Sequence, residues 1–159
     1  MSINRKRLFR ILAVLAAVTA YATIVLGGTV RGMDAGMACP DWPLCNGSIV
    51  PELGNPSVAV EYTHRLVAAL TSLFILLTFV LSLLWFRSDL RLVASSAVTF
   101  ALLVAQVLVG AVTISTGNDV AVVTVHLAVG TATLAFALVV ALVALWPPPA
   151  KLVDDVAPA

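Results

Sequence analysis

The sequence is poor in charge: only 11% of its 159 residues are Asp, Glu, Lys or Arg, whereas 61% are apolar and the mean hydropathy is +1.08. This composition excludes an ordinary water-soluble domain. Aromatic residues make up only 7%, and no basic stripe with interleaved aromatic residues is present, so we expect no nucleic-acid partner. The sequence therefore predicts an integral membrane protein whose surroundings are membrane lipid.

Few residues of the chain lie outside its long apolar runs. A membrane span takes about 20 residues, so the chain has room for about four spans and for no sizeable soluble domain. The first run is longer than a signal-peptide core, and we expect it to remain as a helix. We predict an all-α bundle of four transmembrane helices in one domain, 1–149, followed by a flexible tail, 150–159. The predicted spans are 8–30, 56–86, 92–115 and 120–146, and the predicted outer loop is 31–55.

The cationic residues set the expected orientation of the bundle. Most of them flank the spans on one side, and Lys and Arg are enriched in cytoplasmic segments. We therefore expect both termini to be cytoplasmic and the 31–55 loop to lie on the outer face of the cell membrane. The residues on the cytoplasmic side are Arg5, Lys6, Arg7, Arg10, Arg87, Arg91 and Lys151.

Histidine is scarce too, and its two occurrences fall in comparable places. His64 and His126 lie on the second and fourth spans, which run in the same direction. Measured from Trp85 and Trp146 at the cytoplasmic interface, each lies about 30 Å along its helix. Two imidazoles at one depth across a bundle are what axial ligation of a haem iron requires. We predict that the two histidines are the axial ligands of one haem.

Two charged residues flank the first histidine, in the motif Glu61-x-x-His64-Arg65. An ionisable group in a membrane span costs about 2.5–3.5 kcal/mol on insertion scales, which makes a functional site the default interpretation. The segment around His126 has Val123 and Leu127 at the equivalent positions. An electron-carrying haem needs only its ligands, so the additional acid indicates a reacting site. Arg65 is a candidate for pairing with a haem propionate.

Cysteine occurs only twice, as Cys39 and Cys45 in the predicted outer loop. The intervening prolines, Pro40 and Pro43, stiffen the turn, and a disulfide is feasible in an oxidising compartment. The spacing is not Cys-x-x-Cys, so it supports neither thioredoxin-like chemistry nor a zinc knuckle. A structural disulfide and a redox-active pair both remain open.

Four parts of the sequence resemble the haem A synthases: the segments 27–32 and 38–47, the Glu61 to Arg65 motif, and His126. The usual family member resembles two four-helix bundles in tandem, and this chain is similar to one of them. The resemblance implies oxidation of a ring methyl of haem O to a formyl group, giving haem A for terminal oxidases. It also implies that Glu61 is the catalytic carboxylate, that His64 and His126 surround the substrate haem, and that Cys39 and Cys45 form a disulfide.

The resemblance also implies cofactors and partners. Haem O would be the substrate and haem A the product, and haem B is a further candidate, although the chain lacks a second histidine pair for it. Haem O synthase or another haem donor would deliver the substrate, and a terminal oxidase or assembly factor would accept the product. We also expect a homo-oligomer, because small residues offer faces for close helix contact. They are Gly27, Gly28, Gly32, Ala94, Ser95 and Ala97.

Two other classes of protein compete with this interpretation. A bis-histidine membrane cytochrome of the b type would share the histidines but would leave Glu61 and the cysteine loop unexplained. A quinone-linked thiol oxidase would use the cysteines, but it would need a second pair as a relay. A di-iron bundle would need further acidic ligands on the other spans, which supply none.

Overall fold

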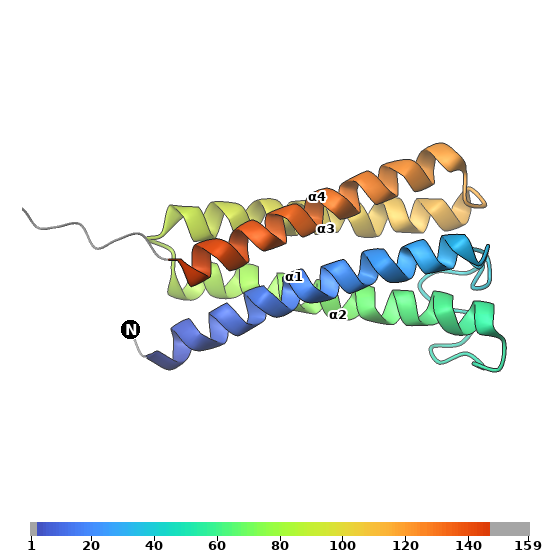
Figure 1. Cartoon of the computed structure of the whole chain (residues 1–159), viewed down its shortest axis with the longest axis horizontal. Coiled ribbons are helices and arrows are strands. Elements are labelled where there is room, and N and C mark those ends of the chain that lie inside the picture. The colour runs from blue at the N-terminus through green and yellow to red at the C-terminus, as the bar shows by residue number, and fades with distance from the viewer. Residues whose placement is uncertain (1–2, 147–159) are drawn as a thin grey trace, which may run out of the picture.

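Four long helices make up most of the computed structural model, which describes residues 3–146 (Figure 1). Each of the four is long and apolar enough to cross a membrane, and residues 3–146 contain no strand. The prediction of an all-α membrane bundle is therefore confirmed, whereas the predicted flexible tail, 150–159, lies outside the described residues. The helices are α1 (Ile3–Gly32), α2 (Pro56–Trp85), α3 (Leu90–Ser115) and α4 (Val120–Leu145).

The helices alternate in direction along the bundle, and each packs against two neighbours. α1 contacts α2 and α4, and α3 contacts the same two helices. α2 and α4 are thus diagonally opposed and run in the same direction (Figure 1). The start of α1 and the end of α4 lie together at what we call the terminal end, and the long connection between α1 and α2 lies at the loop end.

Side-chain caps fix where three of the helices begin. The Oδ1 atom of Asn55 accepts a hydrogen bond from the backbone N–H of Ser57 at 2.9 Å, and Pro56 occupies the first turn of α2. Asp89 and Asp119 cap α3 and α4 in the same way. Caps of this kind satisfy N–H groups that have no partner within the helix. The predicted start of α2 at Pro56 is therefore what the structure shows.

α1 is described from Ile3, so it includes residues before the predicted span 8–30, and its cationic first turns form contacts of their own. The Arg5 guanidinium lies 5.6 Å from the centre of the Trp85 ring. The Nε of Arg10 donates a hydrogen bond to the carbonyl of Ala144 at 2.9 Å, satisfying one of the last acceptors of α4. These contacts join the first turns of α1 to α2 and α4.

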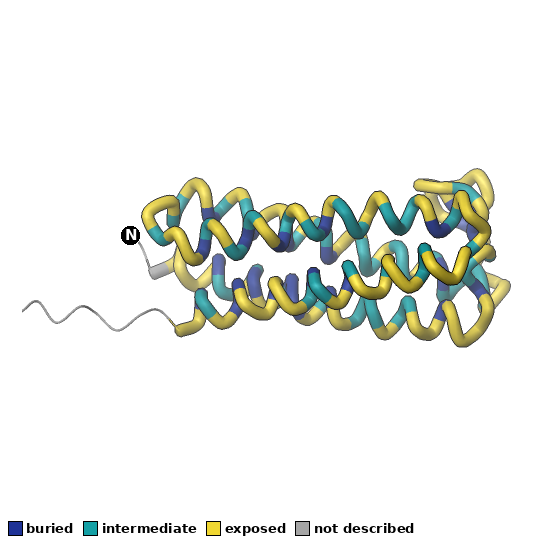
Figure 2. The backbone as a smooth tube through the Cα atoms, turned by 90° about the horizontal axis from the view of Figure 1, so that it is seen from above, coloured by how far each residue is buried: buried dark blue, intermediate teal, exposed yellow. Residues whose placement is uncertain are grey.

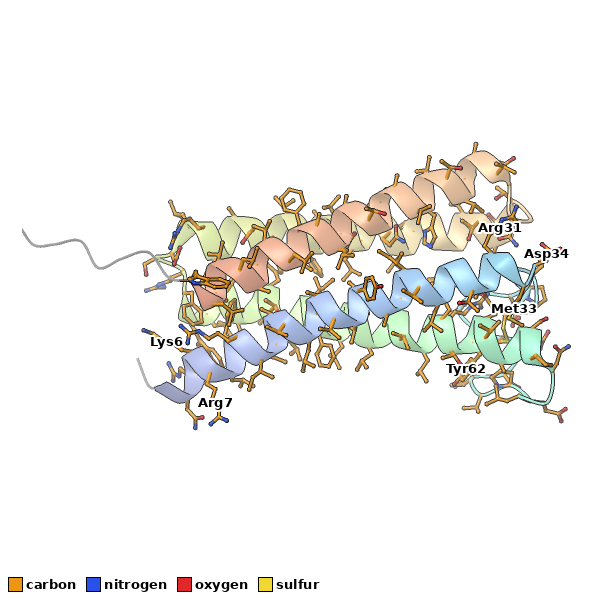
Figure 3. The ribbon with its side chains drawn as sticks, in the orientation of Figure 1. Lys6, Arg7, Arg31, Met33, Asp34 and Tyr62 are labelled. Atoms are coloured by element: carbon orange, nitrogen blue, oxygen red, sulfur yellow. A yellow bond between two sulfur atoms is a disulfide. The ribbon has the colours of Figure 1, made fainter. Side chains whose placement is uncertain are left out.

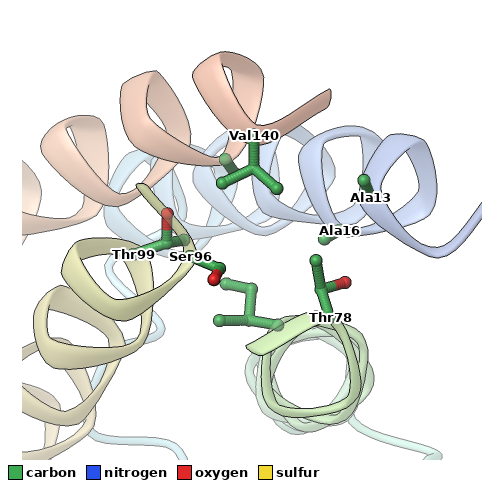
Figure 4. A pocket seen from close by; sticks show the side chains of 8 residues that line it. Ala13, Ala16, Thr78, Ser96, Thr99 and Val140 are labelled. Carbon is green, nitrogen blue, oxygen red and sulfur yellow. The ribbon is translucent and has the colours of Figure 1, made fainter. Parts of the chain in front are cut away.

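The bundle is packed tightly only in the half near the terminal end. Figure 2 shows many of its buried residues gathered there, where small side chains let the helices approach closely. Ser82 and Ser96 join α2 to α3 through a buried hydrogen bond of 2.7 Å. Beside them, a cavity of about 10 Å³, enough for one water molecule, lies between residues of all four helices (Figure 4). The residues lining it are Ala13, Ala16, Ile75, Thr78, Ser96, Thr99, Ala137 and Val140.

The half near the loop end is packed differently. Within the helix segments 21–32, 56–70, 104–115 and 120–129, only Val30, Glu61 and Thr113 are buried. The other side chains there are half-buried or exposed. Both histidines lie in these segments, where few side chains of the helices are buried.

Candidate functional site

His64 packs against α1 at a glycine. A Cβ atom added to Gly27 would lie 3.1 Å from Cε1 of the imidazole, so only glycine gives the ring its full space. The Nδ1 atom of His64 lies 3.1 Å from the backbone oxygen of Thr23. Because a carbonyl oxygen only accepts, Nδ1 carries the proton, and in a neutral ring the lone pair is on Nε2. Metal-binding histidines are oriented by a hydrogen bond of this kind.

His126 on α4 packs in the same manner against α3. A Cβ added to Gly110 would lie 3.0 Å from Cε1 of His126, matching the contact between Gly27 and His64. The pairs α1–α2 and α3–α4 therefore each place a histidine over a glycine of the preceding helix. This repeated contact makes the two helix pairs alike around their histidines.

Gln106 is a site residue that the sequence analysis missed. Its amide Nε2 lies 3.3 Å from Nε2 of His126, and it lies so close to α4 that a Cβ on Gly130 would approach it to 2.9 Å. Two buried atoms, Oε1 of Gln106 and Nδ1 of His126, have no hydrogen-bond partner among residues 3–146. Leaving a buried polar group unpaired costs about 1–3 kcal/mol. A lone amide within the apolar third span was the signal that could have revealed this residue.

The residue types at the loop end suit a haem. His64 and His126 lie on the diagonally opposed helices α2 and α4, which run in the same direction. Among residues 3–146, no group of three or more His, Cys, Asp or Glu side chains could hold a metal ion. Two imidazoles are a donor set that suits a haem, whose porphyrin supplies the other ligands of its iron. The polar atoms left unpaired at His126 and Gln106 agree with a site built for a larger ligand.

Arg65 connects the motif on α2 to the loop 33–55 between α1 and α2. Its Nε donates to Oε1 of Glu61 at 2.8 Å, and the Glu61 residue is only 4% exposed. Its other two nitrogens donate to the carbonyl oxygens of Cys39, Asp41 and Leu44, at 2.7 Å in each case. These bonds use four of the five N–H donors of a guanidinium. One N–H remains for the propionate pairing expected from sequence, which stays a prediction.

The loop that Arg65 binds is closed by a disulfide between Cys39 and Cys45, as the resemblance implied. The Asp41 carboxylate accepts hydrogen bonds from the backbone N–H of Gly47 at 2.8 Å and from that of Asn46 at 2.6 Å. The bond from Gly47 is the main cause that lowers the pKa of Asp41 below its ordinary value of 3.8. Because the pKa of Asp41 is lower in the folded protein than in the unfolded chain, its hydrogen bonds stabilise the loop at neutral pH. That stabilisation is lost only as the pH falls through the folded pKa of Asp41.

The loop also reaches the second helix pair. A Cβ on Gly36 would lie 2.5 Å from Nδ2 of Asn118, in the turn between α3 and α4. Figure 3 shows Arg31, Asp34 and Tyr62 at this loop end, far from Lys6 and Arg7 at the terminal end. The loop therefore contacts both halves of the bundle at the end where the histidines lie.

Comparison with known proteins identifies relatives of this chain. Residues 10–157 match the family model COX15-CtaA, described as cytochrome oxidase assembly protein. A haem A synthase from Symbiobacterium thermophilum is 44% identical over 96 residues, covering 60% of this chain and 30% of that protein. Another from Lysinibacillus sphaericus is 32% identical over 135 residues, covering 80% and 42% respectively.

A relative with a different name also matches. Protoheme IX farnesyltransferase 1 from Natronomonas pharaonis is 39% identical over 101 residues, covering 64% of this chain and 21% of that protein. The chain thus spans less than half the length of each of these three relatives.

Proposed function

Because the chain belongs to the COX15-CtaA family of cytochrome oxidase assembly proteins, we propose that it oxidises a ring methyl of haem O to a formyl group. The observation that supports this proposal is the placement of two histidines on diagonally opposed helices that run in the same direction, with a buried carboxylate one turn from His64. Relatives named haem A synthase support the same reaction. Conversion of a methyl to a formyl group removes four electrons and adds one oxygen atom, so an electron acceptor and an oxygen source are co-reactants.

In this proposal the two histidines hold the substrate. His64 presents Nε2 because its Nδ1 donates to the carbonyl of Thr23. His126 approaches from the opposite side of the bundle and carries Gln106 as a neighbour at its own Nε2. When bound, the haem supplies the iron, the redox chemistry of the site and the methyl group that reacts.

Glu61 acts as the catalytic carboxylate. It lies one helical turn before His64 on α2, is buried, and is fixed in position by Arg65. Oxidation of a methyl group develops positive charge, which a carboxylate held in an environment of low polarity stabilises. The same carboxylate can hold a water molecule or accept a proton.

We further propose that the protein lies in the cell membrane with its loop end on the outer face. The cationic first turns of α1 support this orientation, because Lys and Arg are enriched on the cytoplasmic side of membrane proteins (Figure 3). The product would pass to a terminal oxidase or an assembly factor, in keeping with the description of the family. Haem O synthase is the proposed donor, because a protein named as a protohaem IX farnesyltransferase contains a segment similar to this chain. We keep a permanently bound haem B as a further proposed cofactor.

The function is tested by producing the chain together with haem O synthase in a host without its own haem A synthase. Haems are then extracted from membranes and from the purified protein and separated by chromatography. Formation of haem A supports the proposal. Bound haem that is only of the B or O type would indicate the electron-carrying cytochrome, and a protein without haem would contradict both.

Gly27→Val is expected to lower the haem content of the purified protein by about tenfold, because overpacking typically costs about 1–3 kcal/mol. The new side chain would push His64 away from the Thr23 carbonyl, since even a Cβ would lie 3.1 Å from the ring. Gly54→Val is the control: nothing lies within 4 Å of a Cβ at that position, and Gly54 lies in the loop before α2, away from His64 and from the helix faces of α1. Haem per chain, measured by absorbance, should stay at the parent level in the control. Equal content in both variants would contradict the proposed place of the ring.

We also propose that the protein is a homo-oligomer, most simply a dimer. Gly28 and Gly32 lie one turn apart on α1 with nothing within 4 Å of an added Cβ, and such small residues favour close helix contact. Gly27, which we also expected on such a face, instead packs against His64 within the bundle. Mass measurement in nanodiscs should give at least two chains per particle, and Gly32→Leu should lower that number. A fully active particle with one chain would contradict the proposal.

A further inference from the structure

The Arg65 guanidinium occupies a cage made by the loop 33–55. On one side are the carbonyl oxygens of Cys39, Asp41 and Leu44, and on the other is the Glu61 carboxylate. The side chain of Arg65 is only 16% exposed and that of Glu61 only 5%. A guanidinium keeps its charge, and a buried charge is tolerated only with partners that compensate it. The loop carbonyls and Glu61 are the hydrogen-bond partners that the structure gives this charge.

The three carbonyl oxygens converge because the loop is tied at several points. The disulfide joins Cys39 to Cys45, and backbone hydrogen bonds of 3.0 and 3.1 Å pair Cys45 with Ser48. Nδ2 of Asn46 donates to the carbonyl of Ala38 at 3.2 Å, across the closed end of the loop. Without the disulfide, only the short stretch of chain between them and hydrogen bonds would hold the first and last of the caging carbonyls in place.

We propose that Arg65 is a positioning residue that couples the disulfide to the catalytic carboxylate. The closed loop holds the guanidinium through its carbonyl oxygens, and the guanidinium in turn fixes Glu61. Such coupling is reciprocal by thermodynamic necessity. Loss of the disulfide should therefore loosen Glu61, and loss of the guanidinium should expose the disulfide to reductant.

This role differs from that of a propionate ligand. The cage engages Nε and both terminal nitrogens of Arg65, so a bidentate grip on a propionate would require the guanidinium to leave the loop. The coupling is a property of the chain itself. Only its consequence for the reaction rests on the proposed function, through the role given there to Glu61.

The rate of disulfide reduction tests whether the Arg65 guanidinium protects the disulfide. The protein in nanodiscs is incubated with dithiothreitol, which supplies two electrons and two protons per disulfide, and the resulting thiols are alkylated and counted by mass spectrometry. Arg65→Gln is expected to be reduced at least about tenfold faster than the parent, since hydrogen bonds to a charged group are among the stronger ones. Arg65→Lys should lie between the two, because a lysine keeps the charge but reaches fewer carbonyls.

Arg31→Gln is the matched control for this measurement. Arg31 is also a cation at the loop end, but it is exposed and pairs only loosely with Asp34, at 3.7 Å. Its variant should be reduced at the parent rate. If Arg65→Gln and Arg65→Lys are also reduced at that rate, the guanidinium does not hold the loop and the proposal is wrong.

Infrared spectroscopy tests whether the disulfide helps to fix Glu61. It also covers the case in which Arg65→Gln does not fold. The bands of the Glu61 carboxylate are identified by their loss in Glu61→Gln. In a variant carrying both Cys39→Ser and Cys45→Ser, these bands should shift as the carboxylate loses its fixed partner. Unchanged bands would overturn the coupling. Neither measurement uses haem, so either can fail while haem A formation succeeds, and haem A formation can fail while both succeed.

Discussion

His64→Ala and His126→Ala are each expected to lower the haem content of the purified protein by at least about tenfold and to change the absorbance spectrum of what remains. Changes to groups that merely orient a metal ligand already cost about 10–100-fold in affinity, and these variants remove the ligand itself. The rings come from diagonally opposed helices, so neither can replace the other. Absorbance of the purified protein, supplied with haem during production, provides the measurement.

The control for these variants is Thr63→Ala. Thr63 is the neighbour of His64 on α2, but it is exposed and bonds only to the Ala59 carbonyl of its own helix. Its variant should keep the parent spectrum. If both histidine variants also keep the spectrum and haem content of the parent, the two imidazoles are not the axial ligands.

The helices were predictable from sequence because their causes are local. A long apolar run and an Asn55–Pro56 cap determine α2 with little help from the rest of the chain. The contacts of the first turns of α1 were not predictable, because they depend on two other helices: Arg5 lies over Trp85 of α2, and Arg10 reaches the end of α4. A cation in a sequence does not show which helix end it will contact.

The sequence could place the two histidines at one depth, because α2 and α4 run the same way and the distances along them are nearly equal. That both bind one haem stays a prediction. The glycines that make room for the rings were not predictable in that role. Gly27 and Gly110 matter because of contacts between helices, and a glycine at a contact looks the same in sequence as Gly28, which faces open space.

Arg65 shows a further limit. The sequence placed it beside His64 and therefore toward a haem, but the structure gives it three carbonyl partners from the loop. Backbone carbonyls carry no mark in a sequence, so a cage made of them is visible only once the loop is folded. The same holds for Gln106, whose meaning comes from its position beside His126.

Glu61→Gln is expected to retain haem and to lose haem A formation by about 10²-fold or more, the usual size of a general acid–base contribution. Glutamine has nearly the same shape and can still accept a hydrogen bond from Arg65, which keeps its three loop carbonyls. What it lacks is the negative charge and the ability to take a proton. The variant therefore removes the proposed chemistry of Glu61 while preserving the packing around it.

The measurement is chromatography of haems extracted from the variant produced together with haem O synthase, where unconverted haem O should accumulate. Glu52→Gln is the matched control, because it makes the same change at an exposed carboxylate in the loop between α1 and α2 and should leave haem A formation unchanged. The rate of disulfide reduction in Glu61→Gln should stay within about twofold of the parent, which separates a chemical effect from loosening of the loop. Parent-level haem A from Glu61→Gln would remove the carboxylate from the reaction, and the charge of Glu61 would then serve only to neutralise Arg65 where it enters the bundle.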